Sequence, residues 1–340
     1  MLITDENNLC SLTINSFLTP KIESEYIQDR DLYKEIFTMS MCVLMSTYNG
    51  AKYIEEQIKS IENQEMMGAI EIFIRDDSST DNTIELIRNY SKTSNINISI
   101  HSGTNLGPSG SFLELISMAP DADFYAFCDQ DDVWLPGKII AAETALRVLS
   151  VPALWISNYD VTDDTLNIIE HSALIEPESN QFKALFYNNV PGCTMVFNKA
   201  LLFELRKLCI KKFRMHDILT LCVALITGEV LFDKTPYIYY RQHESNTVGK
   251  YSKKIKPFQW IIDKLGIIFS DESFNYTTYS KRILEIYYDR ISENEIREYR
   301  LIETYQRGMN RFELLKRPYT RGSCGRTAKS IRMRILLGKI

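Results

Sequence analysis

Residues 124–134 read FYAFCDQDDVW. An apolar run ends here in three carboxylates within four positions, Asp129, Asp131 and Asp132. The run predicts a buried strand, so the acids are expected where that strand leaves its sheet. Like charges this close repel each other and are costly to desolvate. A cation bound between them would remove both costs.

Two interpretations of this stretch are open. In extended backbone Asp129 and Asp131 point to one side, and carboxylates at that spacing suit Mg²⁺ or Mn²⁺ bound together with nucleotide phosphates. The simpler interpretation is an Asp-rich turn after a strand, because Asp favours turns. Motifs elsewhere in the chain are needed to distinguish the metal site from the Asp-rich turn.

Length and composition are typical of a globular protein. The chain has 340 residues, of which 45% are hydrophobic and 24% charged, which fits one large domain plus an extension. No apolar stretch approaches the ~20 residues that span a bilayer, and no secretory signal is visible. Seven cysteines without a CxxC pair fit a reducing compartment. We therefore expect a cytoplasmic protein.

The net charge of −5 conceals an asymmetry. Residues 316–340 contain eight Lys or Arg and no acid, which leaves 31 basic and 44 acidic residues elsewhere. The acidic body argues against nucleic-acid binding. Residues 250–268 and 316–340 combine cations with apolar side chains, as segments on anionic membranes do. A core helix with a solvated basic end is the ordinary alternative, and we favour peripheral binding to the inner face of the cell membrane.

From residue 41 onward, apolar runs alternate with helical periodicity. Strands are expected at 41–45, 70–74, 96–100 and 124–128. Helices are expected at 51–64, after Ser79 or Thr80 as the cap, at 111–118, and after Pro136. Strands that alternate with helices are typical of an α/β fold with a mostly parallel sheet covered on both faces.

Polar residues follow three of these four strands. They are Thr47-Tyr48-Asn49-Gly50, Asp76-Asp77-Ser78-Ser79 and Asp129-Gln130-Asp131-Asp132. Ligands of parallel sheets bind beyond the carboxyl ends of the strands. This convergence favours a binding site at that edge.

The second half of the chain is mixed. Strands are expected at 153–156, 193–197 and 237–240, and helices at 200–208, 218–226 and 276–315. The last helix is expected to break near Ser292, where Ser292 and Glu295 fit a capping box. The organisation we expect is an extension over 1–38, a domain over 39–248, and a helical region with a basic tail over 249–340.

Several residues outside the acidic stretch could carry chemistry. Asp76 and Asp77 could accept the imide N–H of uracil or thymine, although acids before a helix are also favoured by its dipole. His216 and His243 stand in polar surroundings, but a lone histidine is more often structural than a ligand. Asp217 could act as a base or simply cap its helix. The absence of G-x-G-x-x-G after the first strand argues against a dinucleotide-binding dehydrogenase.

Six motifs in order resemble family 2 glycosyltransferases with the GT-A fold, of the rhamnosyltransferase-like branch. The resemblance implies a Rossmann-like, mostly parallel sheet flanked by helices, with a C-terminal helical extension. The motifs are STYNGAKYIEEQIKSI (46–61), RDDSSTDNT (75–83), FCDQDDVWLPGKI (127–139), PGCTMVFNKAL (191–201), MHD (215–217) and YRQHESNTVG (240–249).

The resemblance implies a role for each matching residue. Asp217 corresponds to the catalytic base, and Asp129, Asp131 and His243 to the group that binds Mg²⁺ or Mn²⁺. Asp132 would support the same turn. The nucleotide-sugar side would comprise Thr47, Tyr48, Asn49, Asp76, Asp77, Asn105, Asp129, Gln130 and Arg241, with Arg241 beside the diphosphate or metal. The acceptor side would comprise Gly192, Cys193, Trp134 and His216.

The resemblance also implies an inverting, metal-dependent transfer in bacterial cell-surface polysaccharide synthesis, such as that of O-antigen. Its branch favours L-rhamnose from dTDP-L-rhamnose, and a UDP-hexose is the alternative donor. The acceptor would be a saccharide, often lipid-linked. Two departures concern these substrates: Ile218 and Leu219 follow His-Asp where the branch often has aromatic residues, and the loop 105–110 is unusual.

Two alternatives come from other classes. Residues 129–133 also fit the D-x-D-x-[T/V] motif of haloacid-dehalogenase-like phosphatases, with Asp129 as nucleophile and Asp131 as acid and base. That motif normally ends the first strand, whereas three strands are expected before it here. The other alternative is a sugar-nucleotide-binding module without catalysis, against which Asp217 and His243 argue.

Overall fold

A computed structural model describes residues 39–66, 68–171, 176–188, 190–243, 275–321 and 326–340. Residues Met39–Ile340 form one compact unit. The expected extension over 1–38, the basic segment 250–268 and the boundary at 248 lie outside the described residues. No described helix is both long and apolar enough to cross a membrane.

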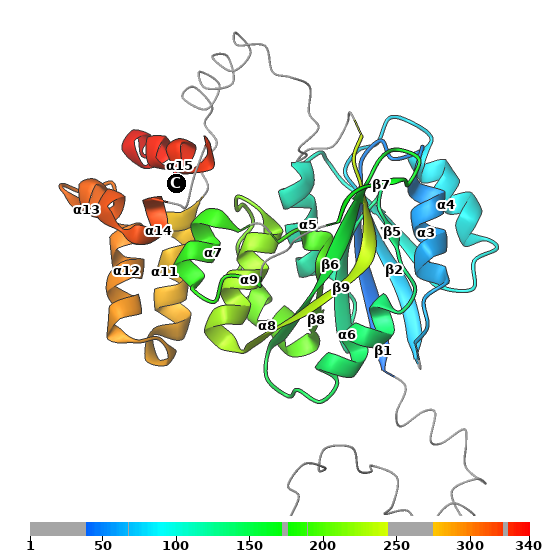
Figure 1. Cartoon of the computed structure of the whole chain (residues 1–340), viewed down its shortest axis with the longest axis horizontal. Coiled ribbons are helices and arrows are strands. Elements are labelled where there is room, and N and C mark those ends of the chain that lie inside the picture. The colour runs from blue at the N-terminus through cyan, green and yellow to red at the C-terminus, as the bar shows by residue number, and fades with distance from the viewer. Residues whose placement is uncertain (1–38, 67, 172–175, 189, 244–274, 322–325) are drawn as a thin grey trace, which may run out of the picture. The chain divides into compact units, whose positions relative to one another are not determined.

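The first half alternates strand and helix as expected (Figure 1). Its strands are β1 (Ser40–Thr47), β2 (Ala69–Asp76), β3 (Asn97–Ser102), β4 (Phe124–Asp129) and the short β5 (Val133–Trp134). Its helices are α3 (Ile54–Glu62), α4 (Thr83–Ser91), α5 (Gly107–Met118) and α6 (Lys138–Leu146).

The second half adds strands and then a run of helices. The strands are β6 (Ala153–Thr162), β7 (Ile168–His171), β8 (Met195–Asn198) and β9 (Glu229–Arg241). The helices are α7 (Gln181–Tyr187), α8 (Lys199–Lys207), α9 (His216–Thr227), α11 (Tyr276–Tyr287), α12 (Glu293–Glu303), α13 (Asn310–Lys316), α14 (Pro318–Arg321) and α15 (Arg326–Leu337).

The strands form one nine-stranded sheet in the order β3-β2-β1-β4-β8-β6-β9-β5, with β7 beside β6. Strands β3, β2, β1 and β4 are mutually parallel, so their carboxyl ends share one edge. The strand order reverses between β1 and β4, where Ser46 is in register with Asp129. Ligands bind at such a reversal in parallel α/β sheets. The α/β class and the mostly parallel sheet are therefore confirmed.

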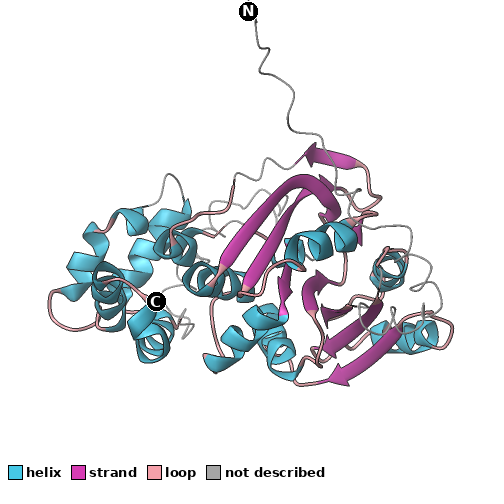
Figure 2. Cartoon of the chain, turned by 90° about the horizontal axis from the view of Figure 1, so that it is seen from below, coloured by secondary structure: helices cyan, strands magenta, loops and turns pink. Residues whose placement is uncertain are grey.

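Alternating side chains of the central strands enter two separate cores, one on each face of the sheet. In β1, Cys42 and Leu44 join the core under α5, α8 and α9, while Met41, Val43 and Met45 join the core under α3, α4 and α6. Figure 2 shows helices on both sides of the strands. Both faces are covered, which explains why these strands read as continuous apolar runs.

The C-terminal helices extend the first of these cores. Tyr276 and Tyr299 belong to it, and the Tyr299 hydroxyl donates to Gln181 of α7 over 2.8 Å. In Figure 1 these helices lie together beyond α7 and α9. The predicted break at Ser292 is confirmed, with both hydrogen bonds of the capping box to Glu295 present.

Several local expectations were wrong. Helix α4 starts at Thr83, because Ser79 instead donates its hydroxyl to Asp76. Strand β8 starts at Met195, because the turn after Pro191 is a short 3₁₀ helix. Strand β9 begins well before 237, and β7, whose side chains are exposed, was not foreseen. Strand β4 ends at Asp129, so Asp129 and Asp131 do not share an extended strand.

Candidate active site

The acidic stretch forms a tight turn at the sheet edge, between β4 and β5. The Gln130 side chain holds this turn against the end of β1: its Oε1 accepts from the Tyr48 amide over 2.8 Å and its Nε2 donates to the Tyr48 carbonyl over 2.9 Å. On the other side, the Arg241 amide donates to Asp132 Oδ1 over 3.2 Å. The turn is thus fixed from both flanks.

Negative charge is concentrated around this turn. Burial, together with the charges of Asp131 and Asp217, raises the pKa of Asp129 to about 7. Burial and the neighbouring carboxylates also raise the pKa of Asp132. The buried cation Lys138 lies beneath them, where its Nζ donates to the Cys193 carbonyl over 2.7 Å and sits 3.6 Å from the Trp134 ring centre. Burial lowers the pKa of Lys138 to about 8.

Asp131 is paired with His243, which follows the end of β9. The two side chains lie 2.8 Å apart, from His243 Nε2 to Asp131 Oδ2. The His243 ring stacks on Tyr53 of the loop before α3, with ring centres 4.8 Å apart. Carboxylate oxygens with an imidazole nitrogen are suitable ligands for Mn²⁺, and carboxylates also for Mg²⁺.

A second set of possible ligand atoms lies deeper, from Asp129, Asp132 and Cys193, all within 4.8 Å of one another. Burial raises the pKa of the Cys193 thiol, so sulfur stays protonated at neutral pH. A hard cation prefers oxygen over a thiol. Mg²⁺ and Mn²⁺ therefore favour the carboxylate oxygens over Cys193, and the metal-binding role of Asp129, Asp131 and His243 stays a prediction.

Asp217 lies in the first turn of α9, where its carboxylate accepts from the Ile218 amide. Burial raises its pKa to about 6, while Arg214 and a hydrogen bond from Asn188 act in the opposite direction. The charge of Asp217 in turn raises the pKa of Asp129, so the two carboxyls lie within electrostatic range. A carboxyl with a pKa near 6 can take up a proton from a hydroxyl close to neutral pH.

On the expected nucleotide side, the two acids at the end of β2, Asp76 and Asp77, are engaged inside the protein. Asp76 accepts from the Thr47 hydroxyl over 2.9 Å and from the Ser79 amide over 2.9 Å. Asp77 accepts from the amides of Leu106 and Gly107, each over 2.8 Å, at the start of α5. Both side chains are buried. They order the loops in which the other expected residues stand.

Three further residues of this side lie in those loops. The side chain of Tyr48 is 48% exposed at the end of β1, which leaves its ring open to a ligand. Asn49 accepts from the Thr80 amide over 2.8 Å. Asn105 accepts from the Gly107 amide over 3.3 Å and is exposed.

The expected acceptor-side residues lie under the turn rather than on an open face. Trp134, Cys193 and His216 are each at most 4% exposed. The His216 ring stacks on Phe112 with centres 3.9 Å apart, and burial lowers its pKa to about 3. A Cβ on Gly192 would come within 2.3 Å of His216 Nε2. His216 is therefore a neutral, packed ring, and the acceptor role of this group stays a prediction.

Sequence reasoning missed several residues that shape the site. Lys138 lies in the motif at 127–139, and its burial could not be predicted from the residue pattern. Glu56 and Tyr53 lie in the motif at 46–61. Their contacts with Arg241 could not be predicted from the helical pattern of that motif. Asp164, in the turn between β6 and β7, had no signal at all.

Comparison with known proteins gives consistent matches. The profile of glycosyl transferase family 2 matches residues 42–203. The chain is similar to dTDP-rhamnosyl transferase RfbG of Shigella flexneri, with 32% identity over 255 residues, 68% of this chain and 86% of the relative. It is 36% identical over 110 residues to abequosyltransferase RfbV of Salmonella typhimurium, 32% of each chain. The crystal structure of S. aureus TarS 1-349 in complex with UDP-GlcNAc aligns with a TM-score of 0.49 and 15% identity, over 88% of this chain and 90% of that chain.

Proposed function

This chain belongs to glycosyltransferase family 2, and we propose that it transfers L-rhamnose from dTDP-L-rhamnose onto a saccharide acceptor in polysaccharide synthesis. Family membership makes it a glycosyltransferase with the GT-A fold and removes the phosphatase alternative. The choice of donor is based on the Shigella flexneri relative, a dTDP-rhamnosyl transferase. The match covers 86% of that relative's length. A UDP-hexose is the alternative donor.

The observation that carries the proposed chemistry is the pairing of two groups at one sheet edge. One is the Asp131–His243 pair with Asp129 beside it, and the other is the buried Asp217. Asp129, Asp131 and His243 would hold Mg²⁺ or Mn²⁺, which supplies charge neutralisation for a diphosphate leaving group. Thr47, Tyr48, Asn49, Asp76, Asp77, Asn105 and Gln130 would form the nucleotide side.

Asp217 would act as the general base. Its carboxylate takes the proton of an acceptor hydroxyl while that oxygen attacks the anomeric carbon. The bond from that carbon to the diphosphate oxygen breaks in the same displacement, and the configuration inverts. A glycosidase would instead need two carboxyls flanking the bond.

Thermal shift with nucleotide sugars, with and without Mn²⁺, tests the donor. A donor at 100 times its dissociation constant stabilises the folded state by about 2.7 kcal/mol. We expect dTDP-L-rhamnose to give the largest shift, and release of dTDP on addition of acceptor. A larger shift with a UDP-hexose would replace the donor. Binding without any turnover would favour the non-catalytic module instead.

We also propose that the C-terminal helices contact an anionic membrane that carries the acceptor. Five exposed apolar side chains stand on the segments of α13 and α15: Met309, Phe312, Met333, Leu336 and Leu337, 39–69% exposed. We call these five residues the α13–α15 patch. Arg311 of α13 donates to the Leu336 carbonyl over 2.9 Å, which joins the two helices. Exposed cations lie near these residues in the chain: Arg307 in the turn before α13, Arg321 at the end of α14 and Lys329 in α15. Apolar side chains among cations suit a surface of anionic lipid.

Flotation with vesicles containing phosphatidylglycerol tests this contact. Deletion of 316–340 would remove Ile331 and Ile335, which are buried in the core, so point variants are cleaner. We expect the double variant Phe312→Ser, Leu336→Ser to lose flotation. The control is Val148→Ser, which removes a side chain that is 78% exposed after α6. Equal flotation of all three proteins would contradict the proposal.

A further inference from the structure

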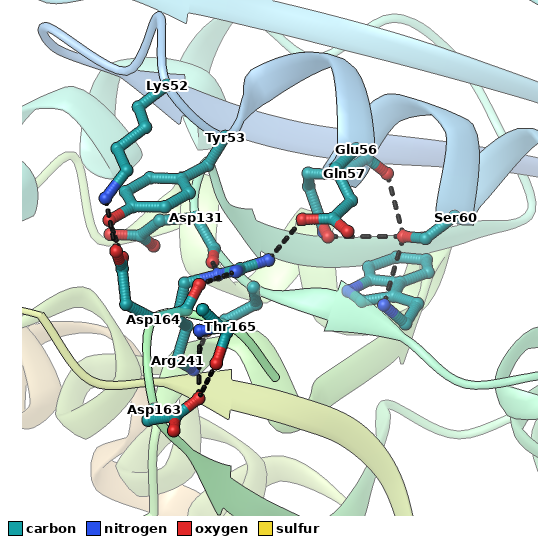
Figure 3. Close-up of polar contacts among 12 residues, drawn as sticks. Lys52, Tyr53, Glu56, Gln57, Ser60, Asp131, Asp163, Asp164, Thr165 and Arg241 are labelled. Atoms are coloured by element: carbon teal, nitrogen blue, oxygen red, sulfur yellow. Dashed lines mark hydrogen bonds and ion pairs between the residues drawn. The ribbon is translucent and has the colours of Figure 1, made fainter. Parts of the chain in front are cut away.

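The guanidinium of Arg241 joins three separate segments of the chain (Figure 3). Its Nε donates to the Asp131 carbonyl over 2.9 Å, and its Nη1 donates to the Asp164 carbonyl over 2.6 Å. Its Nη2 pairs with the Glu56 carboxylate of α3 over 2.5 Å. Each guanidinium nitrogen therefore donates to another part of the protein.

Tyr53 lines the same group. The Arg241 guanidinium carbon lies 4.8 Å from the centre of the Tyr53 ring, and the ring of His243 stacks on Tyr53 at 4.8 Å. The Tyr53 hydroxyl and the Lys52 ammonium both donate to the Asp164 carboxylate. Figure 3 shows Lys52, Tyr53 and Arg241 converging on Asp164, in the turn between β6 and β7.

Both members of the Asp131–His243 pair are fixed through this arrangement. The carbonyl of Asp131 is held by Arg241, and the ring of His243 is held against Tyr53, which Arg241 also contacts. Arg241 is 3% exposed. A buried guanidinium whose three nitrogens donate within the protein is poorly placed to bind a diphosphate as well.

We propose that Arg241 is a positioning residue for the Asp131–His243 pair, and that Glu56 and Asp164 hold it in place. This replaces the sequence-based expectation that Arg241 contacts the diphosphate or the metal. The inference rests on the proposed function in one respect, because it treats that pair as part of a divalent-cation site. Residues that orient metal ligands typically change metal affinity by about 10–100-fold when they are substituted.

The test is Mn²⁺ binding to the full chain without nucleotide, measured by electron paramagnetic resonance. We expect Arg241→Gln to weaken Mn²⁺ binding about 10–100-fold, and Arg241→Lys, which keeps the charge but not the fork, to restore little of it. Glu56→Gln should weaken binding in the same direction but by less. Glu55→Gln, an exposed neighbour on α3, should bind like the wild type.

A second readout separates positioning from direct contact with the diphosphate. In the absence of metal, we expect Arg241→Gln to keep the wild-type ratio of dTDP to thymidine affinity. Unchanged Mn²⁺ affinity with loss of that ratio would overturn the inference and make Arg241 a diphosphate ligand. If Arg241→Gln does not fold, the Glu56→Gln and Glu55→Gln comparison decides, since Glu56→Gln removes only one contact.

The outcomes also separate this inference from the proposed donor. A wild-type protein that binds Mn²⁺ but not dTDP refutes the donor alone, and the Mn²⁺ series still decides the role of Arg241. A wild-type protein that transfers sugar but binds no Mn²⁺ refutes both the cation site and this inference.

Discussion

Replacing Asp217 with Asn should stabilise the protein while abolishing transfer. The folded state raises the pKa of Asp217 from its ordinary 3.8 to about 6. Above pH 6 the carboxylate is ionised in both states, and burial opposes the charge only in the folded one. The raised pKa therefore costs stability at neutral pH, and this cost disappears as the pH falls below the unfolded value near 4.

The size of this effect follows from the two pKa values. The folded and unfolded pKa values differ by about two units, and one pKa unit corresponds to about 1.4 kcal/mol. The ionised Asp217 therefore lowers the free energy of unfolding by roughly 3 kcal/mol at pH 7.5. Asn keeps an acceptor for the Ile218 amide and carries no charge. At roughly 2 °C per kcal/mol for a chain of this size, Tm should rise by about 6 °C. Transfer should fall by about 10²–10⁴-fold, the usual contribution of a general base.

Differential scanning fluorimetry of wild type and Asp217→Asn at pH 4 and pH 7.5 measures the gain. We expect the gain at pH 7.5 and little difference at pH 4. The control is Asp121→Asn, which removes an acid whose side chain is 78% exposed and should change Tm little at either pH. A lower Tm for Asp217→Asn at pH 7.5, or a gain independent of pH, would refute the reasoning.

Three further predictions concern the same site. The pH profile of kcat/KM should rise through a pKa of about 6 as Asp217 loses its proton, and Arg214→Gln should move that midpoint upward because the Arg214 charge favours the carboxylate; an unmoved midpoint would assign the ionisation to another group. Lys138→Met should lower the free energy of unfolding by about 1–3 kcal/mol, because the buried Cys193 carbonyl loses its donor. Urea denaturation measures this loss, and the control is Lys92→Met at an exposed position. Gly192→Ala should cost about 1–3 kcal/mol by overpacking against His216, and this cost should shrink in a His216→Ala background, as a double-mutant cycle would reveal.

Much of the fold could be predicted from sequence because its signals are local. Each apolar run of the first half became a strand, and Ser292 with Glu295 capped α12 as expected. The strand ends were predictable for the same reason, and they fix where Asp76, Asp129 and the residues after Thr47 lie. Short-range patterns therefore predicted which residues lie together at the carboxyl edge of the parallel strands.

The contacts that arrange the site could not be predicted, because they join residues far apart in sequence. Glu56 and Arg241 are separated by 185 positions, and no periodicity relates them. The hydrogen bonds of the Asp77 carboxylate to the start of α5 were not predicted. These bonds depend on how a loop thirty residues later folds back, which local propensity does not encode.

Gln130, which lies between Asp129 and Asp131, affects how this motif should be compared between related sequences. Gln130 forms both hydrogen bonds of an extra rung between β1 and the turn, using its side chain in place of a backbone. Only an amide of this length can donate and accept at those two points, and Gly50 leaves the space that the amide occupies. The side chain of Gln130, between Asp129 and Asp131, thus fixes the turn to the end of β1. When this chain is aligned with its relatives, we expect the residue type at position 130 to vary together with that at position 50, independently of the sugar transferred.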